Sequence, residues 1–312
     1  MDPLKGDASM SKHLAAKIVL ILVTFVSIAK AETKHLILVA GKPSHPPRMH
    51  EFNAGVQLLT KCLEQSTDIK VTFCLNGWPK DDSILDEADA IVFYMDGGGR
   101  HEVVQEQGQR LKRIDALADK GVGLGFMHYG VEIVPDQAGR EFKKWIGGHY
   151  EHMHSCNPIW EPVFASMPDH PISNGVKPFQ VKDEWYFNMR FVSDISGNES
   201  TQVEGMKFVP ILVAAPSADV RDGPYVYPKG PYPHIQASKG RAEAMLWTVE
   251  RANGGRGFGF TGGHFHDNWK NESFRKVVLN AMLWLAKSPI PKNGVKSMLE
   301  EKDLDANLDP KR

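Results

Sequence analysis

The feature that most constrains the fold is a regular alternation of short apolar segments with longer amphipathic ones. Four short segments are apolar and rich in branched or aromatic side chains, as buried strands are: residues 35–40 (HLILVA), 69–75, 90–94 (AIVFY) and 122–127. Residues 51–65 and 103–120 instead carry apolar side chains at the helical period. This alternation predicts a doubly wound α/β fold, in which helices flank both faces of a mostly parallel sheet.

The middle of the chain, residues 150–240, is less regular and richer in proline, glycine and aromatic residues. Strands are predicted there over 185–191 and 209–215. Regular patterning returns afterwards, with two further strands and a strongly amphipathic helix: 244–249, 257–261 and 274–286.

The N-terminal segment has the layout of a secretory signal peptide. Two lysines, Lys12 and Lys17, precede an apolar run over 18–28, and the Ala-Lys-Ala of 29–31 fits a cleavage site. The run is short for a membrane-spanning helix, although an uncleaved anchor is the alternative. We therefore expect a signal peptide over 1–31 with its true start at Met10, and an exported protein, either periplasmic or secreted.

The remaining chain is expected to form one domain over 32–290, followed by a polar tail over 291–312. A net charge of −1 without a run of basic residues argues against a nucleic-acid partner. Contact with a membrane is expected only through the signal sequence. Three cysteines are an odd number, so export does not imply a disulfide framework. A homo-oligomer is compatible with the sequence.

Histidines and carboxylates follow several of the predicted strands. Ligands of open α/β sheets bind beyond the carboxyl ends of the strands, so these residues are the candidate site: His45, His50, Asp96, His128, Glu132, His264 and His266. In an extended stretch His264 and His266 would share one face. Glu184 lies beside Trp185 and Tyr186, a combination that suits an aromatic wall facing a sugar. For each residue the alternative is an ordinary structural role, such as a core hydrogen bond, a cap or a turn.

Five motifs in order resemble the ThuA-like (trehalose-utilisation) family, which is similar in fold to flavodoxin-like class I glutamine amidotransferases. They are GKPSHPPRMHEFNAG, YMDGGGRH, GVGLGFMHYGVE, HPISNGVKPFQVKDEWYF and GRGFGFTGGHFHDNW. The resemblance implies sugar or keto-sugar catabolism, with a small-molecule carbohydrate as the partner. His128 stands where amidotransferases have their nucleophilic cysteine, which argues against glutaminase activity. His266 stands where they have their late catalytic histidine.

Three hypotheses follow, and the sequence leaves all of them open. In the first, the protein is a carbohydrate-active lyase, isomerase or hydrolase that uses His128, Glu184, His264 and His266 as acids and bases. Substrate would contact His45, His50, Asp96, Glu132, Trp185 and Tyr186. In the second, His50, His128 and His264, with Glu184, hold a divalent metal such as zinc. In the third, the domain binds sugar without catalysis. The histidines of 149–155 are interpreted as a surface loop.

Overall fold

A computed structural model describes residues 33–65 and 67–311, and the expected signal peptide over 1–31 lies outside the described residues. Residues Thr33–Arg312 form one compact unit. Within the described part of the chain, no helix has the length and apolar character needed to cross a membrane.

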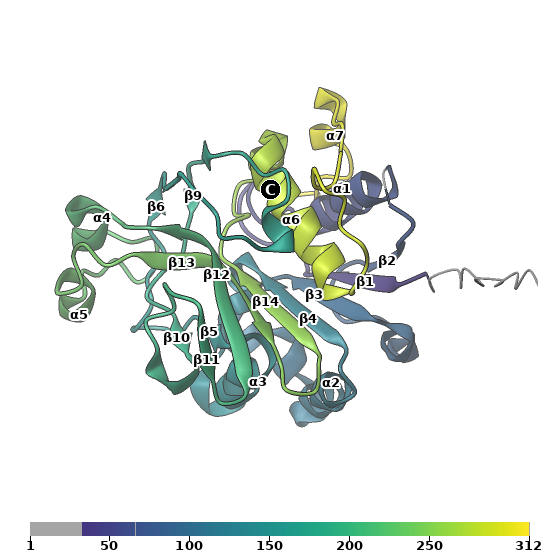
Figure 1. The fold of residues 1–312 in the computed structure, drawn as a ribbon, viewed down its shortest axis with the longest axis horizontal. Coiled ribbons are helices and arrows are strands. Elements are labelled where there is room, and N and C mark those ends of the chain that lie inside the picture. Colours follow the sequence, from purple (N-terminus) through teal and green to yellow (C-terminus); the bar gives the residue numbers. More distant parts are fainter. Residues whose placement is uncertain (1–32, 66, 312) are drawn as a thin grey trace, which may run out of the picture. The chain divides into compact units, whose positions relative to one another are not determined.

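An eight-stranded sheet runs through this unit in the order β11-β12-β13-β14-β4-β3-β1-β2 (Figure 1). Its strands are β1 (His35–Ala40), β2 (Lys70–Cys74), β3 (Ala90–Tyr94), β4 (Gly123–Met127), β11 (Thr201–Val203), β12 (Met206–Ala214), β13 (Glu243–Glu250) and β14 (Arg256–Phe260). The strands from β2 to β14 pair in parallel, whereas β13, β12 and β11 extend the sheet antiparallel. The predicted mostly parallel sheet is confirmed.

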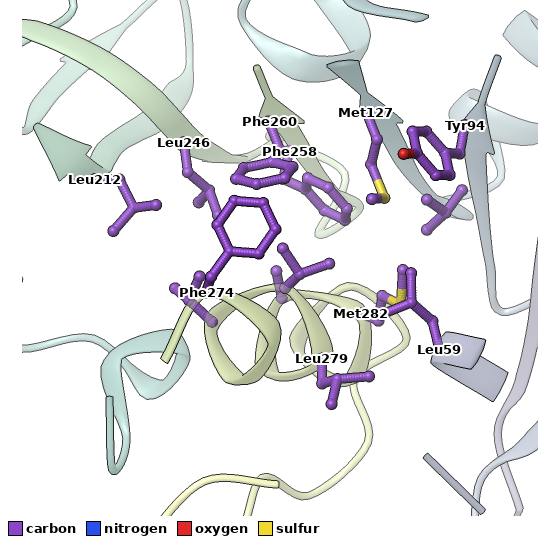
Figure 2. Packing of buried hydrophobic residues seen from close by; sticks show 14 of the residues in the cluster. Leu59, Tyr94, Met127, Leu212, Leu246, Phe258, Phe260, Phe274, Leu279 and Met282 are labelled. Atoms are coloured by element: carbon purple, nitrogen blue, oxygen red, sulfur yellow. The ribbon is translucent and has the colours of Figure 1, made fainter. Parts of the chain in front are cut away.

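Helices pack on both faces of the sheet, as the alternation predicted (Figure 1). One face carries α1 (Phe52–Glu64) and α6 (Glu272–Leu285), and the other carries α2 (Gln109–Asp119) and α3 (Arg140–Ile146). Alternate residues of β1 belong to the two apolar clusters on opposite faces, so every position of HLILVA is buried. In Figure 2, Phe274, Leu279 and Met282 of α6 lie beneath Phe258 and Phe260 of β14.

The middle of the chain folds into short ribbons and short helices beside the antiparallel end of the sheet. The ribbons pair β5 (Gly148–His149) with β10 (Arg190–Phe191), β6 (Ile159–Trp160) with β9 (Asp183–Glu184), and β7 (Val163–Phe164) with β8 (Phe179–Gln180). The short helices are α4 (Ala218–Asp222) and α5 (Pro233–Gln236). The predicted strand over 185–191 is wrong as a continuous element, because only Arg190–Phe191 forms a strand and Phe187 makes an isolated bridge with Cys156. The strand predicted over 209–215 is confirmed as β12.

The start of α2 and the C-terminal segment differ from what the sequence pattern predicts. The helix predicted from residue 103 begins only at Gln109, because Glu106, Gln107 and Gly108 have φ angles of 54°, 53° and 77°. Such left-handed residues interrupt a right-handed helix. Nearer the C-terminus, the polar segment 291–311 includes α7 (Glu301–Asp305), which contacts α1 through the Lys61–Asp303 ion pair and places Leu304 in the apolar core.

Candidate metal centre

His128 sits at the turn where β4 leaves the sheet. Its φ of 53° is left-handed, and the chain bends at once into a short 3-10 turn over His128–Val131. The ring Nδ1 donates to the carbonyl oxygen of Thr261, which follows β14, at 3.0 Å. A carbonyl can only accept, so the proton of the neutral ring is on Nδ1, and Nε2 presents a lone pair.

His50 reaches the same point from the loop between β1 and α1. Its Nδ1 lies 2.9 Å from Oδ1 of Asp96, which also accepts the hydroxyl of Ser44 at 3.0 Å. The backbone N–H of His50 donates to the carbonyl oxygen of His264 at 3.0 Å. A carboxylate that accepts from Nδ1 orients the ring and leaves Nε2 free to act as a ligand.

The loop after β14 is shaped by the fully buried carboxylate of Asp183. Its two oxygens accept the backbone N–H groups of Gly263 at 2.7 Å and His264 at 3.1 Å. Burial raises the pKa of Asp183, and the backbone hydrogen bonds oppose that rise. The next residue, Glu184, places Oε2 2.7 Å from His264 Nδ1. One short strand, β9, thus shapes the His264 loop and also supplies a carboxylate.

Three ring nitrogens and one carboxylate oxygen converge on a single point. His50 Nε2 lies 3.0 Å from His128 Nε2 and 3.0 Å from His264 Nδ1, and the last two are 3.2 Å apart. Glu184 Oε2 is 3.6 Å from His128 Nε2. All four residues are at most 4% exposed.

The three ring nitrogens and the carboxylate oxygen at this point carry more lone pairs than protons. Burial, and then the neighbouring histidines, lower the pKa of His50 and of His128 well below the usual value, so both rings are neutral near pH 7. The Tyr186 hydroxyl lies 3.2 Å from His128 Nε2 and can donate to it. His264 Nδ1 lies within hydrogen-bonding distance of both Glu184 Oε2 and His50 Nε2. Lone pairs this close repel one another unless a positive charge lies between them.

The donor set fits a divalent transition-metal ion. Imidazole nitrogens and a carboxylate oxygen suit zinc and its first-row neighbours. A tetrahedral zinc ion with Zn–N distances of about 2.0–2.1 Å holds its nitrogens roughly 3.3 Å apart. The observed spacings of 3.0–3.2 Å are close to that value. His50, His128, His264 and Glu184 would be the ligands, with Asp96 and the Thr261 carbonyl orienting two of the rings.

A cavity of about 230 Å³ opens directly onto this cluster. Its wall combines hydroxyls, carboxyls, an amide and aromatic rings: His45, Tyr129, Glu132, His152, Asn157, Tyr186, Val226 and Tyr227. The volume lies below the roughly 300–1,000 Å³ of typical ligand pockets, which favours a small ligand. A metal held by the cluster would therefore be reachable from solvent, as in catalytic rather than closed structural sites.

Two predicted site residues are placed elsewhere. Trp185 is fully buried against Phe164, Phe260 and Phe274, so it is no sugar platform. Alternation along an extended segment explains this, because Glu184 and Tyr186 face the cavity and Trp185 points the opposite way. His266 begins a 3-10 turn, so it does not share a face with His264. Burial lowers its pKa to about 4, and its ring nitrogens have no hydrogen-bond partner within the described residues.

The structure also places Asp96, Glu132 and the glycines that follow Asp96. Asp96 contacts His50 and so supports a ligand, and the expected contact of Asp96 with substrate stays a prediction. Glu132 lines the cavity, and the His128 ring is oriented by the Thr261 carbonyl oxygen. The glycines after Asp96 serve close packing: a Cβ on Gly97 would come within 2.1 Å of the Tyr129 carbonyl oxygen, and Gly98 N–H already donates to the Glu132 carbonyl.

Several residues of the site were missed by sequence reasoning. Asp183 directly precedes the predicted Glu184, and a second acid in that motif was the available signal. Asn157 donates to Glu184 Oε1 at 2.8 Å and accepts the Tyr227 N–H at 3.1 Å, yet it lies in the irregular middle segment without a pattern of its own. His152 belongs to the expected surface loop but lines the cavity, whereas its neighbour His149 is buried.

The sequence and the fold were compared with known proteins. A family model described as "ThuA: Trehalose utilisation" matches residues 37–285. No curated protein matches the chain significantly. A protein described as ThuA-like from Parabacteroides merdae shares 16% identity over 88% of this chain and 99% of its own, with a TM-score of 0.54. A second such protein, from Bacteroides uniformis, shares 13% identity over 81% and 91%, also at 0.54. A glutamine amidotransferase from Thermotoga maritima shares 9% identity over 82% and 97%, at 0.36.

Proposed function

We propose that this chain, which belongs to the ThuA (trehalose utilisation) family, is a metal-dependent enzyme that acts on a small carbohydrate. The observation that carries the proposal is the convergence of three buried imidazole nitrogens and one carboxylate oxygen at the floor of a polar cavity. A site that only bound sugar would not need three imidazoles at one point, because sugars are bound largely by aromatic rings and amides.

A divalent ion held by His50, His128, His264 and Glu184 would act as a Lewis acid on a substrate oxygen or on water. Zinc is our first choice because its preferred ligands and distances match the donor set. His50 and His128 are neutral, which is the protonation state that metal binding requires.

The cavity wall supplies groups for moving protons and holding hydroxyls. Glu132 faces the cavity, and its burial, followed by the charge of Glu184, raises its pKa to about 8. A carboxyl group with such a pKa can give and take a proton near neutral pH. The hydroxyls of Tyr129 and Tyr186 and the imidazole of His45 are further donors to a polyhydroxylated ligand. These groups support proton transfer beside a carbonyl, as in isomerisation or elimination of a keto-sugar.

A metal-free alternative also has a specific observation in its favour. His264 Nδ1 and Glu184 Oε2 are 2.7 Å apart, the geometry of a histidine whose basicity is supported by a carboxylate. In that reading His128 and His264 are the acid and base, and no ion is needed. The two readings differ in whether the purified protein retains a metal.

Elemental analysis of the protein, purified without a histidine tag, tests the proposal. We expect about one transition-metal ion per chain, removable by a strong chelator and restored by zinc. Turnover of a panel of keto-sugars and disaccharides should disappear and return with the metal. Metal-independent turnover would support the acid/base alternative. A protein that binds sugars and turns none over would instead be a binding module.

The raised pKa of Glu132 predicts a pH-dependent effect on stability that needs no substrate. Below about pH 4 the carboxyl is protonated in both the folded and the unfolded chain. As pH rises towards about 8, the unfolded chain loses this proton while the folded protein keeps it, which favours unfolding. Above about pH 8 the penalty stays constant, at up to about 5 kcal/mol for a shift of this size.

Glu132→Gln should therefore stabilise the metal-free protein at pH 8.5 and leave it nearly unchanged at pH 4. Urea unfolding of chelator-treated protein at the two pH values measures the difference. An effect of the same size at both would show that the amide acts through packing and not through the proton of Glu132.

A further inference from the structure

The end of α7 and the residues after it cross the loop that carries His50, although more than 250 residues separate the two in sequence. Arg48 Nη1 donates to the Leu304 carbonyl oxygen at 2.8 Å, and its guanidinium also pairs with Asp305. The N–H of Asp309 donates to Glu51 Oε2 at 2.8 Å. These contacts are thus made at Arg48 and Glu51, which precede and follow the ligand His50 in the sequence.

Glu51 is the centre of these contacts and is only 1% exposed. Oε1 accepts the backbone N–H of Arg48 at 2.9 Å, which closes the loop around His50. The same oxygen lies 3.2 Å from Lys311 Nζ, and that ammonium group also donates to the Met49 carbonyl. The Lys311 side chain is itself 4% exposed. A buried carboxylate is costly unless it is paired, so the cation from the C-terminal segment compensates the charge of Glu51.

The loop needs such support because its backbone is unfavourable by itself. His45, Arg48 and His50 have φ angles of 61°, 68° and 48°, all in the left-handed region. Each such residue costs about 1 kcal/mol or more and persists only where its surroundings impose it. On the inner side the loop is held by the His50 N–H bond to His264 and by the His266 N–H bond to the Arg48 carbonyl. The outer side is held by residues 304–311.

We propose that residues 304–311 form a strap that fixes His50 in its metal-ligating position, with Lys311 and Glu51 as the positioning residues. The inference rests on the proposed metal site, and it assigns a function to the polar C-terminal segment. Without Lys311 the buried charge of Glu51 loses its compensation, the loop relaxes, and Nε2 of His50 leaves the ligand cluster.

Lys311→Met keeps much of the side-chain volume and removes the charge. We expect zinc affinity, measured by competition with a chromophoric chelator, to fall about 10- to 100-fold, the range seen when residues that support a metal ligand are replaced. Lys311→Arg retains a cation and should recover most of that affinity. The matched control is Lys302→Met, since this lysine of the same segment is 76% exposed and pairs only with Glu300 among the described residues. It should bind zinc like the wild type.

A second readout separates the strap from the metal site. In metal-free protein, Lys311→Met should speed hydrogen exchange at the backbone amides of residues 48–51 and spare those of β4. Zinc affinity within twofold of wild type would overturn the proposal. If the wild type binds no metal, the proposed function fails, and unchanged exchange at residues 48–51 would overturn the strap as well. Should Lys311→Met not fold, Arg48→Met, whose side chain is 38% exposed, gives the same two readouts.

Discussion

Replacing His128 with alanine is expected to lower zinc affinity by about 100- to 1,000-fold. Four-ligand zinc sites bind with about 10–16 kcal/mol, so each ligand contributes roughly 3–4 kcal/mol. His128 is central to the cluster, because its Nε2 lies within 3.2 Å of a nitrogen of both His50 and His264. The same substitution at His264 should have an effect of similar size.

In the metal-free protein, His128→Ala should lower the free energy of unfolding by less than the loss of a buried histidine usually does. The reason is that the substitution also removes a lone pair that the neighbouring lone pairs repel. Zinc should raise the melting temperature of the wild type, because a ligand that binds only the folded state stabilises it. The His128→Ala variant should show little rise. His234→Ala is the control, as His234 is an exposed histidine beside His154, outside the cluster. A His128→Ala variant that still binds zinc tightly would contradict the assigned ligands.

Asp183→Asn is expected to destabilise the protein by about 2–4 kcal/mol, although it changes one atom. The fully buried carboxylate of Asp183 accepts backbone N–H groups through both oxygens: from Glu184 and His264 on Oδ1 and from Gly263 on Oδ2. An amide has one accepting oxygen, and its NH₂ group would face a donor. A buried N–H that loses its acceptor costs about 1–3 kcal/mol, with more for bonds to a charged group.

Urea unfolding near pH 7 measures this loss. Zinc affinity should fall in the same variant, because the loop that places His264 loses its anchor. Asp267→Asn provides the control: this aspartate lies in the neighbouring turn, is 62% exposed and pairs with Arg48 at 3.2 Å. Exposed pairs contribute little, so its effect should stay below about 1 kcal/mol. Equal midpoints for Asp183→Asn and the wild type would show that the loop holds its shape without the carboxylate.

The sequence predicted the framework of the site because that framework depends on periodicity. Residues 36–40 (LILVA) are apolar at every position, as expected of a strand with helices on both faces, and β1 is such a strand. Parallel strands bring their carboxyl ends to one edge of the sheet. His50, His128 and His264 could therefore be expected to meet there, and the structure brings them within hydrogen-bonding distance.

Errors arose where the local backbone decides the direction of a side chain. His266 was paired with His264 on the assumption of an extended segment, but a 3-10 turn begins at His266. That turn leaves no periodic signal in the residues around it. Trp185 was grouped with Glu184 by adjacency, although neighbours in an extended stretch point to opposite sides.

The sequence by itself thus determined the fold class and the edge at which the histidines gather, because apolar periodicity dictates which faces are buried. Only the tertiary structure decided which side chains meet at the cluster and what supports them. Asp183 and Glu184 arrive from a two-residue strand, Thr261 contributes a carbonyl oxygen, and Lys311 comes from the far end of the chain. These contacts depend on the close approach of segments remote in sequence, whose distances no local pattern encodes.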